Sequence, residues 1–160
     1  METIVMKIGG SVLTYKDSAS LKIRRKRLQN IATEIATARM RKRGKRLLLV
    51  HGAGSAGHVL AKRFELGKRV FDPTQREALA RIRANNQQLN HALVLALLEA
   101  GVPALPVHIG SVITQQDSKL VTFDNRLVTA ALESGFVPVL YGEIVNDMKL
   151  GFSICSGDAI

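Results

Sequence analysis

Residues 46–58 read RLLLVHGAGSAGH, and this stretch indicates the fold class. Residues 47–50 are continuously apolar, without the alternation of apolar and polar side chains that a half-exposed strand shows. A strand of this kind is typical of a parallel sheet that is covered on both faces. The glycines at Gly52, Gly54 and Gly57 allow the next backbone segment to approach a ligand closely. The stretch therefore predicts a buried parallel strand that enters a ligand-binding loop.

Further strand and helix signals alternate on both sides of this stretch. Short apolar runs predict more strands, at residues 3–8, 104–107 and 137–141. Apolar residues at helical spacing predict helices at residues 22–43, 59–65, 73–100 and 124–133. Such an alternation is typical of parallel strands whose sheet is covered by helices. We therefore expect an α/β protein, a three-layer α/β/α sandwich with a largely parallel sheet.

Two acidic residues predict helix starts. Asp72 can cap the long helix, since Pro73 suits the first helical position and Gln75 can complete a capping box. Asp124 is expected to cap the helix that follows it. An extended piece at residues 111–114 and a hairpin-like segment that begins at residues 143–145 complete the predicted elements.

Composition restricts the class of protein. The chain has 160 residues, 46% of them hydrophobic, which is enough to bury a core. A single cysteine, Cys155, excludes an internal disulfide and a Cys-rich zinc site. No apolar run approaches the roughly 18 residues that span a bilayer, and the first residues lack the features of a secretory signal. We expect a cytoplasmic protein without a membrane partner.

The net charge of +10 is unevenly distributed. Residues 21–46 contain 11 basic residues and one acidic residue, Glu34. Apolar residues at helical spacing in the same stretch place the basic side chains on a solvent-exposed helix face. Nucleic acid is not expected as a partner, because no aromatic residue lies among the basic ones to stack on bases. A positive field that attracts phosphorylated small molecules is the alternative.

Two glycine-bearing segments follow predicted strands. Residues 7–11 read KIGGS, where consecutive N–H groups can form an anion-binding nest and Lys7 points to the same spot; a simple turn is the alternative. Residues 52–57 match the dinucleotide fingerprint, but the only acid near the required spacing of roughly 20 residues is Asp72, a helix cap. A phosphate site before the next helix remains, with His58 as a hydrogen-bond donor and His51 as a structural residue.

The order of the motifs resembles the amino acid kinase superfamily, and within it the isopentenyl phosphate kinases. The motifs are KIGGS, Lys16, HGAGSAGH, PVLYGEIV and SGD, and they span the whole chain. His58, the second histidine of the glycine loop, is the discriminating feature, since relatives that act on carboxylates generally lack it. Three positions depart from the family pattern: Ala53 replaces a glycine, Glu143 an aspartate, and Ala159 the second aspartate after SGD.

The resemblance implies transfer of the ATP γ-phosphoryl group to isopentenyl phosphate in isoprenoid biosynthesis, with Mg²⁺ accompanying ATP. It assigns catalytic roles to Lys7, Lys16, His58 and Asp158, the last of which would orient Lys7. ATP would contact Lys7, Gly9, Gly10, Ser11 and Gly54. The acceptor would contact Ala53, Gly54, His58 and Gly157. No residue is assigned as a metal ligand.

The resemblance also implies a domain organisation. Residues 1–160 would form the N-terminal, acceptor-binding lobe, and a nucleotide-binding lobe would follow residue 160, so we expect these residues alone to be inactive. The long helix is expected to form a homodimer, and its apolar residues line a pocket for the prenyl tail or belong to the core. Two alternatives stay open: a kinase of another small phosphate, phosphonate or carboxylate, and a non-catalytic basic binding module.

Overall fold

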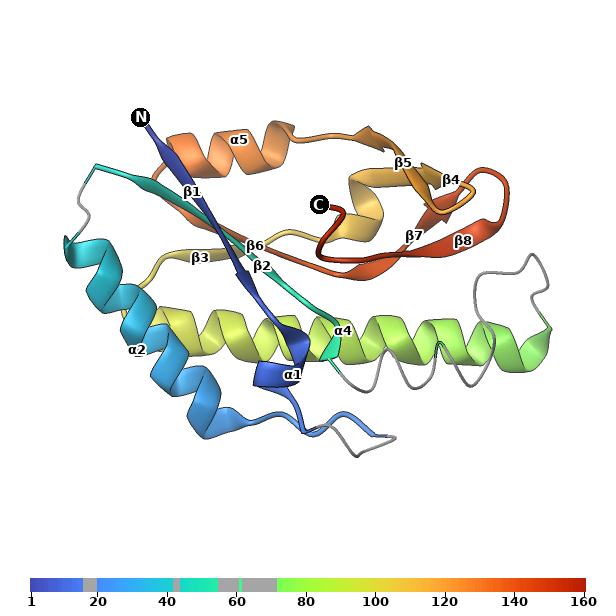
Figure 1. Ribbon diagram of the computed structural model, residues 1–160, viewed down its shortest axis with the longest axis horizontal. Coiled ribbons are helices and arrows are strands. Elements are labelled where there is room, and N and C mark those ends of the chain that lie inside the picture. Colours follow the sequence, from blue (N-terminus) through green and yellow to red (C-terminus); the bar gives the residue numbers. More distant parts are fainter. Residues whose placement is uncertain (16–19, 42–43, 55–60, 62–71) are drawn as a thin grey trace.

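A parallel sheet lies at the centre of the molecule (Figure 1). The computed structural model describes residues 1–15, 20–41, 44–54, 61 and 72–160. The strands of this sheet are, in spatial order, β1 (Thr3–Ile8), β2 (Arg46–His51), β6 (Val137–Tyr141) and β3 (Ala104–Pro106). All three pairings are parallel, so the expectation drawn from residues 47–50 is confirmed.

Two helices cover one face of this sheet. They are α2 (Arg25–Arg41) and α4 (Pro73–Glu99), which lie together below the sheet in Figure 1. Leu28 of α2, Leu93 of α4 and Leu49 of β2 belong to one hydrophobic cluster, and all three side chains are almost fully buried. The basic residues of α2 are mostly exposed, as the charge pattern predicts.

The opposite face is covered by α5 (Arg126–Glu133) and by a second sheet. Its strand order is β5 (Lys119–Phe123), β4 (Ile113–Gln116), β7 (Glu143–Asp147) and β8 (Gly151–Cys155), with η1 (Ile109–Ser111) before β4. Only the β4–β7 pairing is parallel. Val50 and Leu140 of the central sheet pack against Val128 of α5 and Val145 of β7. The three predicted layers are present. They include a second, mixed sheet, of which the sequence predicted only the extended piece at residues 111–114 and the hairpin-like segment that begins at residues 143–145.

Local signals at the helix starts were partly right. The carboxylate of Asp72 accepts a hydrogen bond from the Gln75 N–H at 2.8 Å, and the Gln75 side chain accepts one from the Asp72 N–H at 3.3 Å, so the capping box is confirmed. The predicted cap at Asp124 is wrong, because α5 starts one residue later, with Asn125 as its N-cap. The Asp124 carboxylate accepts a hydrogen bond from the Arg126 N–H at 3.2 Å and binds the Arg126 guanidinium at 2.5 Å.

Other boundaries differ slightly from the expectations. A single helical turn, α1 (Gly10–Leu13), stands directly after β1, where a loop was expected. The helix expected at residues 59–65 lies, apart from Ala61, outside the described residues. Among the described residues, no helix combines the length and the apolar character that crossing a membrane requires.

A buried aspartate joins the two turns of the second sheet. The Asp147 side chain accepts hydrogen bonds from four backbone N–H groups, at 2.8 to 3.0 Å. Two of them belong to Asp117 and Ser118 in the β4–β5 turn, and two to Lys149 and Leu150 in the β7–β8 turn. This carboxylate therefore fixes the hairpin that forms one wall of the groove described below.

Candidate phosphate-binding site

The carboxyl ends of three parallel strands meet at one edge of the central sheet. Gly9 and Gly10 follow β1, residues 52–54 follow β2, and Gly142 follows β6. In open α/β sheets this edge is where ligands bind. Gly157 comes from the loop after β8 and packs on the same edge, where a Cβ would lie 3.1 Å from the carbonyl oxygen of His51.

The first two glycine loops touch each other. A Cβ at Gly10 would lie 2.6 Å from the Cα of Gly54 and 2.9 Å from the carbonyl oxygen of Gly52. These neighbours are backbone atoms, which cannot rotate away as a side chain can. The Gly52 N–H also donates to the Ile8 carbonyl at 3.0 Å. The two glycine motifs therefore form one backbone surface.

Gly54 needs glycine for two reasons. Its φ is +74°, a left-handed conformation that other residues adopt at a cost. A Cβ there would lie 2.7 Å from Oγ1 of Thr14, a buried residue whose hydroxyl donates to the Gly10 carbonyl at 3.0 Å. Thr14 thus contacts both glycine loops and helps to fix their positions, a role that the sequence did not indicate.

Lys7 and Asp158 form an ion pair between the end of β1 and the loop after β8. The two residues are 151 positions apart, and their side chains are 42% and 74% exposed. An exposed pair of this kind adds little to stability. Its consequence is geometric, because it holds the Lys7 ammonium over the strand ends where the glycine loops meet.

His51 is buried below the loops. Its Nδ1 lies 3.0 Å from the Gly52 carbonyl oxygen and its Nε2 lies 3.2 Å from Oδ1 of Asn90 on α4. The ring stacks on Tyr141 at a centroid distance of 5.4 Å. Burial lowers the pKa of His51, although its hydrogen bonds to Gly52 and Asn90 act in the opposite direction. His51 therefore acts as a structural residue that ties β2 to α4 and β6, as its position at the strand end predicted.

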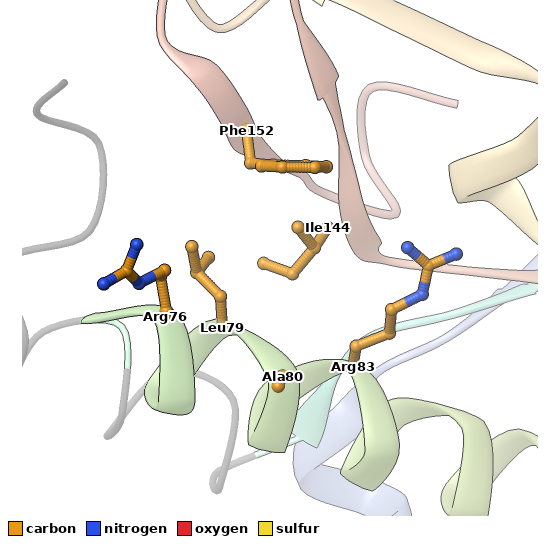
Figure 2. A pocket seen from close by; sticks show the side chains of 6 residues that line it. All are labelled: Arg76, Leu79, Ala80, Arg83, Ile144 and Phe152. Carbon is orange, nitrogen blue, oxygen red and sulfur yellow. The ribbon is translucent and has the colours of Figure 1, made fainter. Parts of the chain in front are cut away.

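An apolar groove of about 390 Å³ opens beside this edge, between α4 and the β7–β8 hairpin (Figure 2). Its walls are formed by Leu79 and Ala80 from α4, Ile144 from β7 and Phe152 from β8, together with two arginines, Arg76 and Arg83. Ile144 is nearly fully buried, whereas Phe152 is 47% exposed. The volume lies in the range of roughly 300–1,000 Å³ that is typical of small-molecule sites.

The groove explains one expectation and adds residues that the sequence analysis missed. The apolar side chains of the long helix fall into two groups. Leu79 lines the groove, whereas Leu93 and Leu97 belong to the core. Arg76 and Arg83 were not singled out. Their spacing of seven residues, which places them on one helix face with Leu79, is the signal that was available.

The predicted site residues can now be placed. The structure gathers most of them in the converging loops, namely Lys7, Gly9, Gly10, Ser11, Ala53, Gly54, Gly157 and Asp158. Lys16 and His58 lie outside the described residues. No three His, Cys, Asp or Glu side chains of the described ranges cluster as ligands for a metal ion.

The arrangement agrees with a comparison against protein families. The amino acid kinase family matches residues 2–160. The chain belongs to the amino acid kinase family. The isopentenyl phosphate kinase of Methanothermobacter thermautotrophicus is 36% identical over 98% of this chain, and that of Methanocaldococcus jannaschii is 32% identical over 98%. The present chain spans about 60% of the length of these two relatives.

Solved structures agree with the family assignment. One isopentenyl phosphate kinase structure superposes with a TM-score of 0.88 and 35% identity, covering 99% of this chain and 66% of its own. A substrate complex of an isopentenyl phosphate kinase superposes with a TM-score of 0.80 at 26% identity, covering 97% of this chain and 62% of its own. The parallel sheet, its covering helices and the mixed second sheet are therefore the amino acid kinase fold.

Proposed function

We propose that this chain is the acceptor-binding lobe of an ATP-dependent kinase that phosphorylates isopentenyl phosphate to the diphosphate. The observation that carries the proposal is the apolar groove, which lies beside two glycine loops and a lysine. A prenyl phosphate has the matching chemistry, a doubly charged head and a short apolar tail. The names of the relatives support the same acceptor.

In the proposed reaction, the bond between the γ-phosphorus and its bridging oxygen in ATP breaks, and an acceptor phosphate oxygen bonds to that phosphorus. ADP leaves. Such transfers need positioning and charge neutralisation rather than covalent help from the protein. Lys7, held by Asp158, would place its ammonium between the two polyanions. The backbone of residues 9–11 would contact the ATP phosphates, where α1 begins without a side-chain cap.

The acceptor phosphate would lie on the amides of Ala53 and Gly54, with His58 as a donor and Lys16 as an added positive charge. The acceptor tail would follow α4 into the groove and contact Leu79, Ile144 and Phe152. Gly157, which lies close to the end of β2, would contact the substrate.

Magnesium is proposed to arrive with ATP. Proteins bind Mg²⁺ in phosphoryl-transfer sites through one or two carboxylates, waters and the substrate phosphates rather than through a cage of side chains. When bound, the ion would neutralise phosphate charge.

The test is isothermal titration of the purified chain with candidate acceptors, because these residues alone are expected to bind the acceptor without turning it over. Isopentenyl phosphate is expected to bind more tightly than an alkyl phosphonate or N-acetylglutamate. The His58→Ala variant should weaken the binding of isopentenyl phosphate. Tighter binding of the carboxylate would favour the alternative of another kinase in the same superfamily, and no binding of any of the three would favour a non-catalytic module.

We also propose a homodimer formed through α4 and a cytoplasmic location, where ATP is abundant. Leu95 and Leu98 support the dimer, since they are 45% and 49% exposed on the outer side of α4. The mass from light scattering at micromolar concentration is the direct test, and a monomer would contradict the dimer.

A further inference from the structure

Arg83 stands in the wall of an otherwise apolar groove. Arg76, Leu79, Ala80 and Arg83 follow one another at helical spacing on the face of α4 that lines the groove. The Arg83 side chain is half-buried. A charged group in such a wall is costly unless it is paired or serves a ligand. Figure 2 shows the two guanidinium groups at opposite ends of the groove, with the apolar side chains between them.

The contacts of α4 show which end of the groove faces the glycine loops. Asn90 contacts His51 at the end of β2, and Nδ2 of Asn86 donates to the Gly142 carbonyl at 3.0 Å, at the end of β6. Arg83 lies one turn further toward the N-terminus of α4. Arg76 lies seven residues beyond Arg83, about 10 Å further along the helix axis. Arg83 is therefore at the mouth of the groove, where the strand ends and the apolar walls meet, and Arg76 is at the distal end.

The Arg83 guanidinium packs against Gly110. A Cβ at Gly110 would lie 2.9 Å from Nη2 of Arg83, so the glycine leaves the space that the guanidinium uses. Within the described residues, no hydrogen bond or salt bridge holds this group. Its donors are thus available at the groove.

The nearby acidic side chain is Glu143, which is 1% exposed. Its Oε1 accepts from the Ile144 N–H at 2.8 Å, and its Oε2 has no hydrogen-bond partner within the described residues. Burial raises the pKa of Glu143, although the Ile144 N–H and the charge of Arg83 act in the opposite direction.

We infer that Arg83 binds the anionic head of the acceptor at the mouth of the groove, as a further substrate-binding residue; this inference rests on the proposed function. A guanidinium presents paired N–H donors that match two phosphate oxygens, which a neutral side chain cannot do. In this arrangement the head group lies between the glycine loops and Arg83, and the tail extends along Leu79 toward Arg76. The site then selects acceptors that combine a phosphate with a short apolar tail.

The experiment compares two arginines on the same helix. Arg83→Gln removes the groove guanidinium, and Arg81→Gln removes the same charge from a side chain that is 67% exposed and paired with Glu77. Isothermal titration with isopentenyl phosphate should show at least about tenfold weaker binding for Arg83→Gln and no change for Arg81→Gln. Titration with ATP should give the same affinity for Arg83→Gln as for the wild type. Arg83→Lys, which keeps a charge, should recover part of the affinity.

Three results would overturn the inference. The first is equal acceptor affinity in the Arg83→Gln and Arg81→Gln variants. The second is an equal loss of affinity for isopentenol, the uncharged alcohol, which would assign the effect to packing in the groove. The third is full recovery of Arg83→Gln by a second change, Glu143→Gln, which would make Arg83 only a partner of that acid. Tighter wild-type binding of another phosphorylated acceptor, still weakened by Arg83→Gln, would refute the proposed acceptor alone, whereas no acceptor binding would refute both.

Discussion

Replacement of Asp147 by asparagine tests how the groove hairpin is held. Oδ1 of Asp147 accepts the N–H groups of Asp117, Lys149 and Leu150, and Oδ2 accepts the N–H of Ser118 at 2.8 Å. Asparagine can keep the three bonds to one oxygen but turns an NH₂ group toward the Ser118 N–H. It also removes the charge from all four bonds. Hydrogen bonds to charged groups contribute about 1.5–3 kcal/mol each and are not additive, so we expect a loss of about 2–4 kcal/mol.

The turn that this carboxylate holds is itself strained. Asp117 and Ser118 have φ values of 54° and 60°, which non-glycine residues adopt at a cost. Weakening the bonds to their N–H groups should therefore release this turn first. Under conditions in which the protein stays folded, hydrogen exchange of the Ser118 amide should be faster in the Asp147→Asn variant than in the wild type.

The loss should depend on pH in a defined direction. Burial would raise the pKa of Asp147, but the N–H groups of Leu150, Ser118 and Lys149 outweigh it and hold that pKa well below its usual range. A group whose folded pKa is depressed stabilises the fold above its unfolded pKa, near 3.9, and this contribution is lost as the pH falls below that value. Urea denaturation of the wild type and the variant should thus differ most above about pH 5 and converge in stronger acid.

A neighbouring aspartate provides the matched control. The Asp117 side chain is 56% exposed and pairs with the Lys149 ammonium at 2.7 Å, so Asp117→Asn should cost less than about 1 kcal/mol. Equal unfolding free energies of wild type and Asp147→Asn at pH 7 would refute the reasoning, as would a difference that persists unchanged into acid.

Two further predictions concern the glycine loops and the ion pair. Gly10→Ala should destabilise the fold by about 1–3 kcal/mol through overpacking and weaken phosphate binding, because the new Cβ meets the backbone of Gly54; thermal melts and titration with ATP measure both effects, and unchanged values would contradict the contact. Asp158→Asn should change the unfolding free energy by less than about 1 kcal/mol, since its pair with Lys7 is exposed, yet shift the ATP affinity measured by titration, because Lys7 is then no longer held; an ATP affinity equal to that of the wild type would remove Asp158 from the phosphate-binding arrangement.

Local signals in the sequence were sufficient for the individual elements. The apolar run at residues 47–50 predicted a buried parallel strand, because a strand covered on both faces needs no polar side chains. The capping box of Asp72 and Gln75 was readable because both partners lie within four residues. For α5 the predicted boundary was one residue too early: Asn125 takes the N-cap position, and the Asp124 carboxylate contacts the N–H and the guanidinium of Arg126.

The tertiary structure decided how these elements build a site. The contact of Gly10 with Gly54, the ion pair of Lys7 with Asp158, and the hairpin wall of the groove each join segments that are far apart in the chain. A glycine motif shows which backbone positions lack a side chain. It does not show which other backbone segment will pack into the space that the missing side chain leaves. Likewise, the spacing on α4 places Arg83 on one face, but only the packing of β7 and β8 against that face makes it the wall of a groove. These pairings depend on the free energy of burying distant surfaces together, which no local pattern encodes.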